Sequence, residues 1–212
     1  MLLVTFQVVG LVVLLSGFLG VTAAYAMARR DFPGKKIVML IFLLPLLVPP
    51  ITFGIPLATA LYQVGLGGTF WGIVVASLVP TVPFVILVMI PFIEQIDPKV
   101  EAAARVFGAG TFKLFRHVLL PMLTPGIQAA MLLVLVRTVA MSELTFLTAG
   151  PTSRTLVVSL YYSVFAAGVR SVQSLDAMAV IYMVTSLIWL LIALRFVNPT
   201  QIVARARQPA QH

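Results

Sequence analysis

The stretch that decides the fold is DPKVEAAARVFGAGTFKLFRHVLLPMLTPG, residues 97–126. It is a polar, helix-forming segment between two long apolar runs, residues 70–92 and 122–146. Its charged side chains exclude it from the hydrocarbon core of a membrane, because each ionised group there is costly unless it is paired or hydrated. We therefore interpret it as an ordered element in a loop of a membrane protein. An amphipathic element in such a loop predicts contact with a partner.

The composition excludes a soluble domain. The chain has 212 residues, of which 61% are hydrophobic and 9% are charged, whereas a soluble domain carries about 25% charged residues. Its apolar runs are continuous and about 20 residues long, the length that a helix needs to cross about 30 Å of hydrocarbon. A transmembrane β-barrel would show short alternating segments instead. We therefore predict an all-α, polytopic membrane helix bundle.

We predict about five transmembrane helices, at Leu2–Met27, Ile37–Tyr62, Phe70–Phe92, Met122–Phe146 and Ala177–Val197. Lysine and arginine residues concentrate after the first, third and fifth of them, which accounts for the net charge of +8 without a nucleic-acid partner. The positive-inside rule then places the N-terminus outside and the C-terminus in the cytosol. In this interpretation residues 1–197 form the transmembrane domain, residues 97–121 a cytosolic loop, and residues 198–212 a flexible cytosolic tail.

Residues 155–169, TLVVSLYYSVFAAGV, leave the topology open at one point. The segment is apolar, but it is short for a span. As a sixth span it would move the C-terminal tail to the outside. We favour a helix that lies at the outer interface, because Tyr161 and Tyr162 suit that depth.

Proline interrupts the second predicted span. Four prolines lie within it, at Pro45, Pro49, Pro50 and Pro56. Each proline removes a helical donor and crowds the preceding turn, and interrupted spans often line transport pathways. Pro49 and Pro50 are therefore candidate translocation-path residues. The alternative is a structural kink that packs against other helices.

The polar segment predicts a helix–turn–helix elbow. Asp97 is suited to cap a helix, with Pro98 at its first position. Glu101 adds negative charge in the first turn, where the helix dipole favours it. Gly108 and Gly110 predict a break and a sharp turn.

A second short helix is expected after this turn, over Thr111–Leu119. Phe112, Phe115 and Leu119 recur at helical spacing along it. We expect Leu120-Pro121 to end this helix before the fourth span begins.

The same segment resembles a motif of a known family. The pattern EAA, three residues, G, nine residues, I-x-L-P marks the membrane subunits of binding-protein-dependent ABC importers of the type I class. The matching positions in this chain are Ala103, Ala104, Gly108, Val118, Leu120 and Pro121. The position of the motif's glutamate holds Ala102, and Glu101 lies one residue earlier.

In that family the elbow is a coupling helix that fits a groove on the ATPase subunit. The resemblance therefore implies a permease domain with these ATPase-coupling residues: Glu101, Ala102, Ala103, Ala104, Gly108, Phe112, Leu120 and Pro121. It also implies three kinds of partner in a bacterial inner membrane: ABC ATPase subunits, a second permease subunit of the same or another kind, and a periplasmic or lipid-anchored solute-binding protein.

The resemblance covers nearly the whole chain. AYAMARRDFPGKK, residues 24–36, is similar to the family's first cytosolic loop, and LLPLLVPPITFGIPL, residues 43–57, to its proline-rich span. Residues 142–162, SELTFLTAGPTSRTLVVSLYY, resemble the branch that handles iron(III), 2-aminoethylphosphonate or polyamines. Family members usually have one more N-terminal helix, which this sequence lacks.

No nucleotide-binding or catalytic motif accompanies the elbow. Gly34-Lys35-Lys36 is the nearest imitation of a P-loop, and it lacks the upstream glycine and the Ser or Thr after the lysine. The sequence also lacks the clustered polar groups of an enzyme site. We therefore predict no enzymatic activity, catalytic residue, metal site or cofactor in this chain; ATP and Mg would be used by the partner ATPase.

Two ionisable residues lie within or near the end of the fourth predicted span, Arg137 and Glu143. They are six residues apart, which is too far round a helix for a direct i,i+3 or i,i+4 pair. Both are candidate residues of the translocation path. The alternatives are snorkelling to the membrane surface or pairing with another helix.

Two other classes of function compete with an ATP-driven permease. A secondary, ion-coupled transporter would need inverted repeats and buried coupling charges, and the sequence shows no repeat. An integral-membrane enzyme would need a catalytic cluster. The sequence does not indicate the solute, or whether two permease subunits would be identical.

Overall fold

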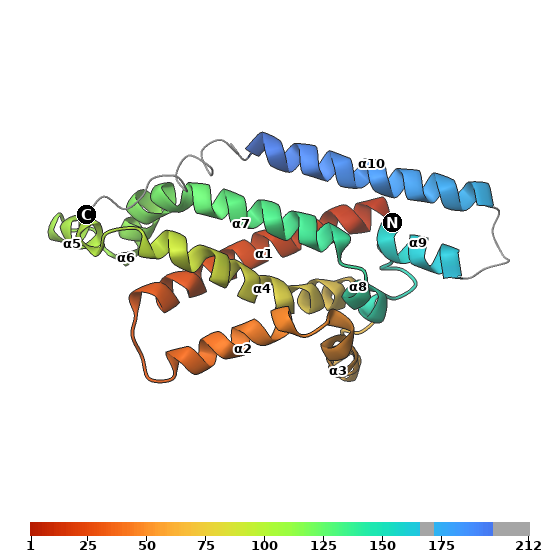
Figure 1. The fold of residues 1–212 in the computed structure, drawn as a ribbon, viewed down its shortest axis with the longest axis horizontal. Helices are drawn as coiled ribbons and strands as arrows, with labels where there is room; N and C mark the ends of the chain where they lie inside the picture. The colour runs from red at the N-terminus through yellow and green to blue at the C-terminus, as the bar shows by residue number, and fades with distance from the viewer. Residues whose placement is uncertain (166–171, 197–212) are drawn as a thin grey trace.

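The computed structural model describes residues 1–165 and 172–196, and every regular element in that part of the chain is a helix (Figure 1). The helices are α1 Leu2–Arg29, α2 Lys35–Leu47, α3 Pro50–Gln63, α4 Phe70–Glu94, α5 Pro98–Val106, α6 Thr111–Leu114, the π-helix η1 Phe115–Leu119, α7 Leu120–Ala140, α8 Glu143–Thr148, α9 Leu156–Phe165 and α10 Val172–Phe196. The predicted tail, residues 198–212, lies outside the described residues.

The core lies between α1, α4 and α7, which run side by side along the molecule (Figure 1). Aliphatic side chains from all three helices fill it, including Ala24, Ile86, Met89 and Val134, each at most 1% exposed. Gly20 lets α1 approach α4 closely, because a Cβ at this position would lie 2.5 Å from the Cβ of Val85. Close contact through small residues is typical of helices that pack within a membrane.

The all-helical prediction is confirmed. Three helical stretches are long and apolar enough to cross a membrane: Leu2–Arg29, Phe70–Glu94 and Thr111–Ala140, with α2 and α3 together as a fourth if the bent pair is one span. The fifth predicted span falls on α10, which contains a shorter apolar stretch, Asp176–Ile192. These counts apply to residues 1–165 and 172–196.

The second predicted span is broken at Pro49 and Pro50, as their positions in the sequence predicted. Helix α2 ends at Leu47, α3 begins at Pro50, and the two helices are bent by 104°. Pro49 precedes α3 with an extended backbone, ψ 135°, as expected for a residue that is itself followed by proline.

The fourth predicted span is shorter than we predicted. Helix α7 ends at Ala140, and Met141 adopts an extended conformation with ψ 105°. Glu143 then begins the separate helix α8. Our prediction of a single helix over Met122–Phe146 was therefore wrong. Hydropathy alone does not detect a break between two apolar helices.

The helix ends form two groups at opposite ends of the molecule (Figure 1). Helices α5 and α6 lie with the C-terminal end of α1 at one end of the molecule, and α3, α8 and α9 lie towards the other. With ten residues, α9 rises about 15 Å, which is half the hydrocarbon thickness. This part of residues 155–169 is too short to cross a membrane; its position at the outer interface stays a prediction, and residues 166–169 lie outside the described chain.

Candidate coupling site and translocation path

The first arm of the elbow forms as the sequence predicted. The Asp97 carboxylate accepts a hydrogen bond of 2.8 Å from the backbone N–H of Lys99 and caps α5, and Pro98 occupies the first helical position. Gly108 has φ +81° and ends the arm with a left-handed turn, a conformation that a residue with a Cβ adopts only at a cost. Gly110 is the N-cap of α6.

The second arm continues into the membrane helix, so our prediction that Leu120-Pro121 ends it was wrong. Thr111–Ala140 runs as one 30-residue helical stretch. The helix widens to a π-turn over Phe115–Leu119, where the Leu120 N–H donates to the Phe115 carbonyl. Pro121 follows directly, and a π-turn is a place where a helix absorbs an irregularity in its hydrogen bonds. The proline therefore shifts the helical register without stopping the helix.

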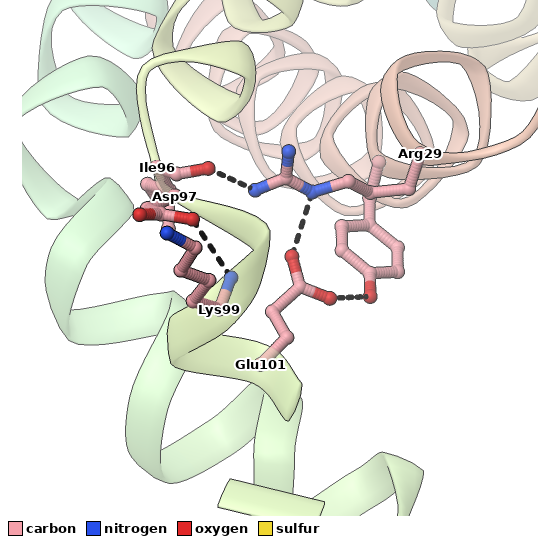
Figure 2. A network of polar contacts seen from close by, with 6 residues as sticks. Arg29, Ile96, Asp97, Lys99 and Glu101 are labelled. Carbon is pink, nitrogen blue, oxygen red and sulfur yellow. Dashed lines mark hydrogen bonds and ion pairs between the residues drawn. The ribbon is translucent and has the colours of Figure 1, made fainter. Parts of the chain in front are cut away.

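A buried ion pair attaches the elbow to α1 (Figure 2). Arg29 Nε lies 2.6 Å from Glu101 Oε1, and the Tyr25 hydroxyl donates a 2.7 Å hydrogen bond to Glu101 Oε2. Arg29 Nη2 also donates to the carbonyl of Ile96, at 2.6 Å. The side chains of Arg29 and Glu101 are 14% and 10% exposed. Both carboxylate oxygens therefore have donors, which is the condition for keeping a charge out of water.

The outward face of the elbow is apolar. Val106, Phe107 and Phe112 are 85%, 90% and 75% exposed, and Ala102 and Ala103 are also exposed, while Ala104 is half-buried. Phe112 was among the predicted coupling residues, whereas Val106 and Phe107, which are at least as exposed, were not. A signal for them was present, since two large apolar residues stand immediately before the glycine turn. Exposed apolar groups on a short, otherwise polar element are typical of a protein-contact surface.

The structure therefore divides the predicted coupling residues. Glu101 is 8% exposed and faces α1. Gly108 forms the turn, and Phe112 lies on the outward face. Leu120 is 39% exposed and Pro121 is also exposed at the start of α7, so both belong to the second arm rather than to the turn.

The candidate path residues do not all come together. Glu143 is exposed at the start of α8 and lines a cavity of about 120 Å³; the other lining residues are Ile51, Ser142, Phe146, Val158 and Tyr161. Ile51 follows Pro49 and Pro50, so the break between α2 and α3 lies beside Glu143. The Arg137 guanidinium instead stacks 5.3 Å from the Phe84 ring centroid. Within residues 1–165 and 172–196, no ion pair joins Arg137 to Glu143.

Across the described residues, no three His, Cys, Asp or Glu side chains gather in a group that could hold a metal ion. The two candidate sites can therefore bind a partner or a solute but offer no catalytic group: one is an exposed apolar face at one end of the molecule, and the other is a carboxylate beside aromatic rings at the opposite end. The long helices α1, α4 and α7 connect these two ends (Figure 1).

Comparison with known proteins agrees with this geometry. A family model described as "Binding-protein-dependent transport system inner membrane component" matches residues 16–203. The chain belongs to this family. The predicted family resemblance, the helical fold class and the inner-membrane, multi-span character are therefore confirmed at this level, and members of the family are permease subunits that are not themselves catalytic.

Several permeases are similar in sequence to part of the chain. The probable sulfate transport system permease protein cysT of Chlorokybus atmophyticus is 33% identical over 138 residues, which cover 59% of this chain and 48% of that protein. The trehalose transport system permease protein SugB of Mycobacterium tuberculosis is 34% identical over 118 residues, 56% of this chain and 43% of that one. For the molybdenum transport system permease protein ModB of Escherichia coli, identity is 32% over 148 residues, 64% and 65% of the two chains. The chain thus spans about half the length of the first two.

Solved structures share the fold. A chain from the crystal structure of a bacterial ABC transporter involved in the import of the acidic polysaccharide alginate superposes with a TM-score of 0.70 at 18% identity, over 97% of this chain and 78% of that one. The alginate ABC transporter in complex with an alginate pentasaccharide-bound periplasmic protein gives a TM-score of 0.68 at 18% identity, over 91% and 75%.

Proposed function

We propose that this chain is the membrane-spanning permease subunit of an ATP-driven ABC importer. The observation that supports it is the elbow of a family member, with Glu101 anchored on α1 and with Val106, Phe107 and Phe112 turned outward. Such a surface fits a groove on a separate ATPase. That ATPase would use ATP and Mg and push the elbow, and this chain would contribute no catalytic group.

The remaining partners follow from the same proposal. A binding-protein-dependent permease receives its solute from a soluble receptor outside the membrane. The similar alginate transporter was solved in complex with a periplasmic protein. We therefore infer a solute-binding protein at the end that carries α3, α8 and α9, and a second permease subunit that completes the translocation path.

The solute path is proposed to pass the break between α2 and α3. Pro49 and Pro50 form this break, and Glu143 lines the adjacent cavity. Arg137 is a weaker member of the predicted path, since its stacking on Phe84 supports the alternative of pairing with another helix. Pro49, Pro50 and Glu143 are therefore the path residues that mutagenesis should address first.

Glu143 bears on the finer assignment. Iron(III) and polyamines are cations, and 2-aminoethylphosphonate carries an ammonium group beside its anionic phosphonate, whereas sulfate and molybdate offer a carboxylate only negative charge. The cavity also contains Phe146 and Tyr161, whose ring faces attract cations. Together with the resemblance of residues 142–162, this supports the iron(III), 2-aminoethylphosphonate or polyamine branch.

The function is tested by docking and transport together. The chain is co-expressed with ABC ATPases of the same genome, and co-purification is compared for wild type and Phe107→Glu. Phe32→Glu is the matched control, because Phe32 is a 38% exposed phenylalanine in the loop between α1 and α2 and is not part of residues 97–121. We expect Phe107→Glu to abolish co-purification and Phe32→Glu to retain it. ATP-independent counterflow by the purified chain in proteoliposomes would instead support the secondary transporter and contradict our proposal.

A further inference from the structure

We propose that Glu101, Arg29 and Tyr25 form a latch that transmits displacement of the elbow directly into α1. In this role Glu101 is a positioning residue inside the chain and does not contact the ATPase. The inference rests on the proposed function, since it assumes that an ATPase moves the elbow. It adds the route by which that movement enters the membrane helices.

The first argument is how little else holds α5. Of the nine residues of α5, Glu101 alone is buried. Ala102 and Ala103 are exposed, and Ala104 reaches only the edge of the core. An apolar face would normally attach a short surface helix to its protein. Here the attachment is a carboxylate that receives two hydrogen bonds from α1.

The second argument is the convergence of contacts on one end of α1 (Figure 2). Tyr25 and Arg29 are four residues apart, so both point from the same face of the helix. Arg29 holds Glu101 in α5 and also the carbonyl of Ile96, in the linker that precedes α5. The Tyr25 ring lies 6.1 Å from that of Phe115, edge to face, in the second arm. The end of α1 therefore contacts both arms and the linker before them.

The third argument is the weakness of the alternative route along the chain. Gly108 and Gly110 separate the two arms, and a Cβ at either would meet no atom within 4 Å. A glycine turn without packing around it is flexible. Little of a displacement of the first arm would therefore pass through it to the second arm. The second arm reaches α7 directly, because the helix is continuous from Thr111 to Ala140.

The first arm is joined to α4 by the three residues between Glu94 and Pro98. Arg29 holds this linker as well, through the carbonyl of Ile96. Displacement of the first arm therefore acts on α1 through the latch, and α1 packs closely on α4.

The test measures whether the elbow and α1 move as one body. The chain contains no cysteine, so Lys99→Cys on α5 and Leu3→Cys near the start of α1 can be spin-labelled selectively. Both positions are exposed. Residues 3 and 29 are separated by about 39 Å along a helix, a distance that pulsed electron paramagnetic resonance measures well. The distance is recorded in the complex with the ATPase, without nucleotide and with ATP plus vanadate.

The latch is removed by the double substitution Arg29→Met/Glu101→Leu. Changing both partners leaves no unpaired buried charge, which is the main reason why single variants of buried pairs fail to fold. The matched control is Arg30→Met/Glu94→Leu, because Arg30 follows Arg29 in the chain, Glu94 ends α4, and both residues are exposed and carry the same charges as the latch pair. Tyr25→Phe retains the ring against Phe115 and removes one hydrogen bond to Glu101. Gel filtration, circular dichroism and ATPase co-purification establish that each variant is folded and assembled.

In wild type and in the control we expect the distance to remain the same when ATP plus vanadate is added. In the double variant we expect it to shift, and Tyr25→Phe should broaden the distribution. A wild-type distance that shifts as it does in the double variant would overturn the latch, and so would a double variant that behaves like wild type. Failure of the wild-type chain to bind any ATPase would instead remove the proposed function, and that result precedes the distance measurement.

Discussion

Glu101 and Ala102 are adjacent in the chain but lie on different sides of α5: Glu101 is 8% exposed and bonded to α1, whereas Ala102 is exposed. The family motif that this segment resembles has its glutamate at the position of Ala102. In this chain the carboxylate is one residue earlier, and one residue turns a helix by about 100°. The carboxylate therefore attaches α5 within the chain, and the large side chains that the elbow exposes, Val106, Phe107 and Phe112, are apolar.

Loss of the Glu101 side chain should destabilise the protein. Glu101→Ala leaves Arg29, whose side chain is only 14% exposed, without an anion, and removal of one partner of such a pair costs up to about 3 kcal/mol. Thermal unfolding in detergent, followed by circular dichroism, should show a clearly lower midpoint. Glu94→Ala is the control, because Glu94 is exposed at the end of α4; equal midpoints for the two variants would contradict the structural role of the pair. Ala102→Glu should leave the midpoint unchanged.

The turn of the elbow depends on Gly108. Gly108→Val forces a β-branched residue to φ +81°, which costs about 1–2 kcal/mol and favours a different turn. Gly65→Val imposes a similar strain at φ +75° in the loop after α3, and neither glycine has an atom within 4 Å of its Cβ position. We expect both variants to be destabilised by similar amounts and only Gly108→Val to lose ATPase co-purification. If Gly108→Val assembles as wild type does, the elbow is not the docking element.

The approach of α1 to α4 depends on Gly20. Gly20→Ala places a methyl group 2.5 Å from the Val85 Cβ, so the helices must separate, at a cost of about 1–3 kcal/mol. Gly10 is a helical glycine of the same helix with no atom within 4 Å of its Cβ position. Gly10→Ala should therefore stabilise slightly, by about 0.5–1 kcal/mol, through helix propensity. Opposite shifts in the thermal midpoint would support the packing, and a stabilised Gly20→Ala would contradict it.

Neutralisation of Glu143 should weaken transport of a cationic solute. Glu143→Gln retains the size of the side chain and removes its charge. In proteoliposomes that contain the whole complex, uptake of a polyamine probe such as spermidine should fall up to about fivefold, because the charge contact of an exposed carboxylate contributes at most about 1 kcal/mol. Glu94→Gln, at the opposite end of α4, is the control and should transport normally. Uptake of molybdate by wild type, unaffected by Glu143→Gln, would point to the oxyanion permeases instead.

Much of the fold could be predicted from local patterns. Spans follow from the length of apolar runs, since a helix satisfies its own backbone donors and acceptors in lipid. The break before Pro50 and the cap at Asp97 also follow from single residues whose backbone chemistry is decisive. The same reasoning failed at Pro121, where a π-turn absorbed the proline, and at Met141, where an apolar stretch changed direction without a glycine or proline.

The sequence by itself determined the membrane class, the helix–turn–helix elbow and the family motif, because each depends on hydrogen bonds and apolar area within a few neighbouring residues. Only the tertiary structure decided which way Glu101 points and that its partner is Arg29, 72 residues away. It also separated Arg137 from Glu143, which share a predicted span but contact different helices. Such pairings arise when helices far apart in the chain pack together and a charge must find its counterion there, and no local pattern carries that information.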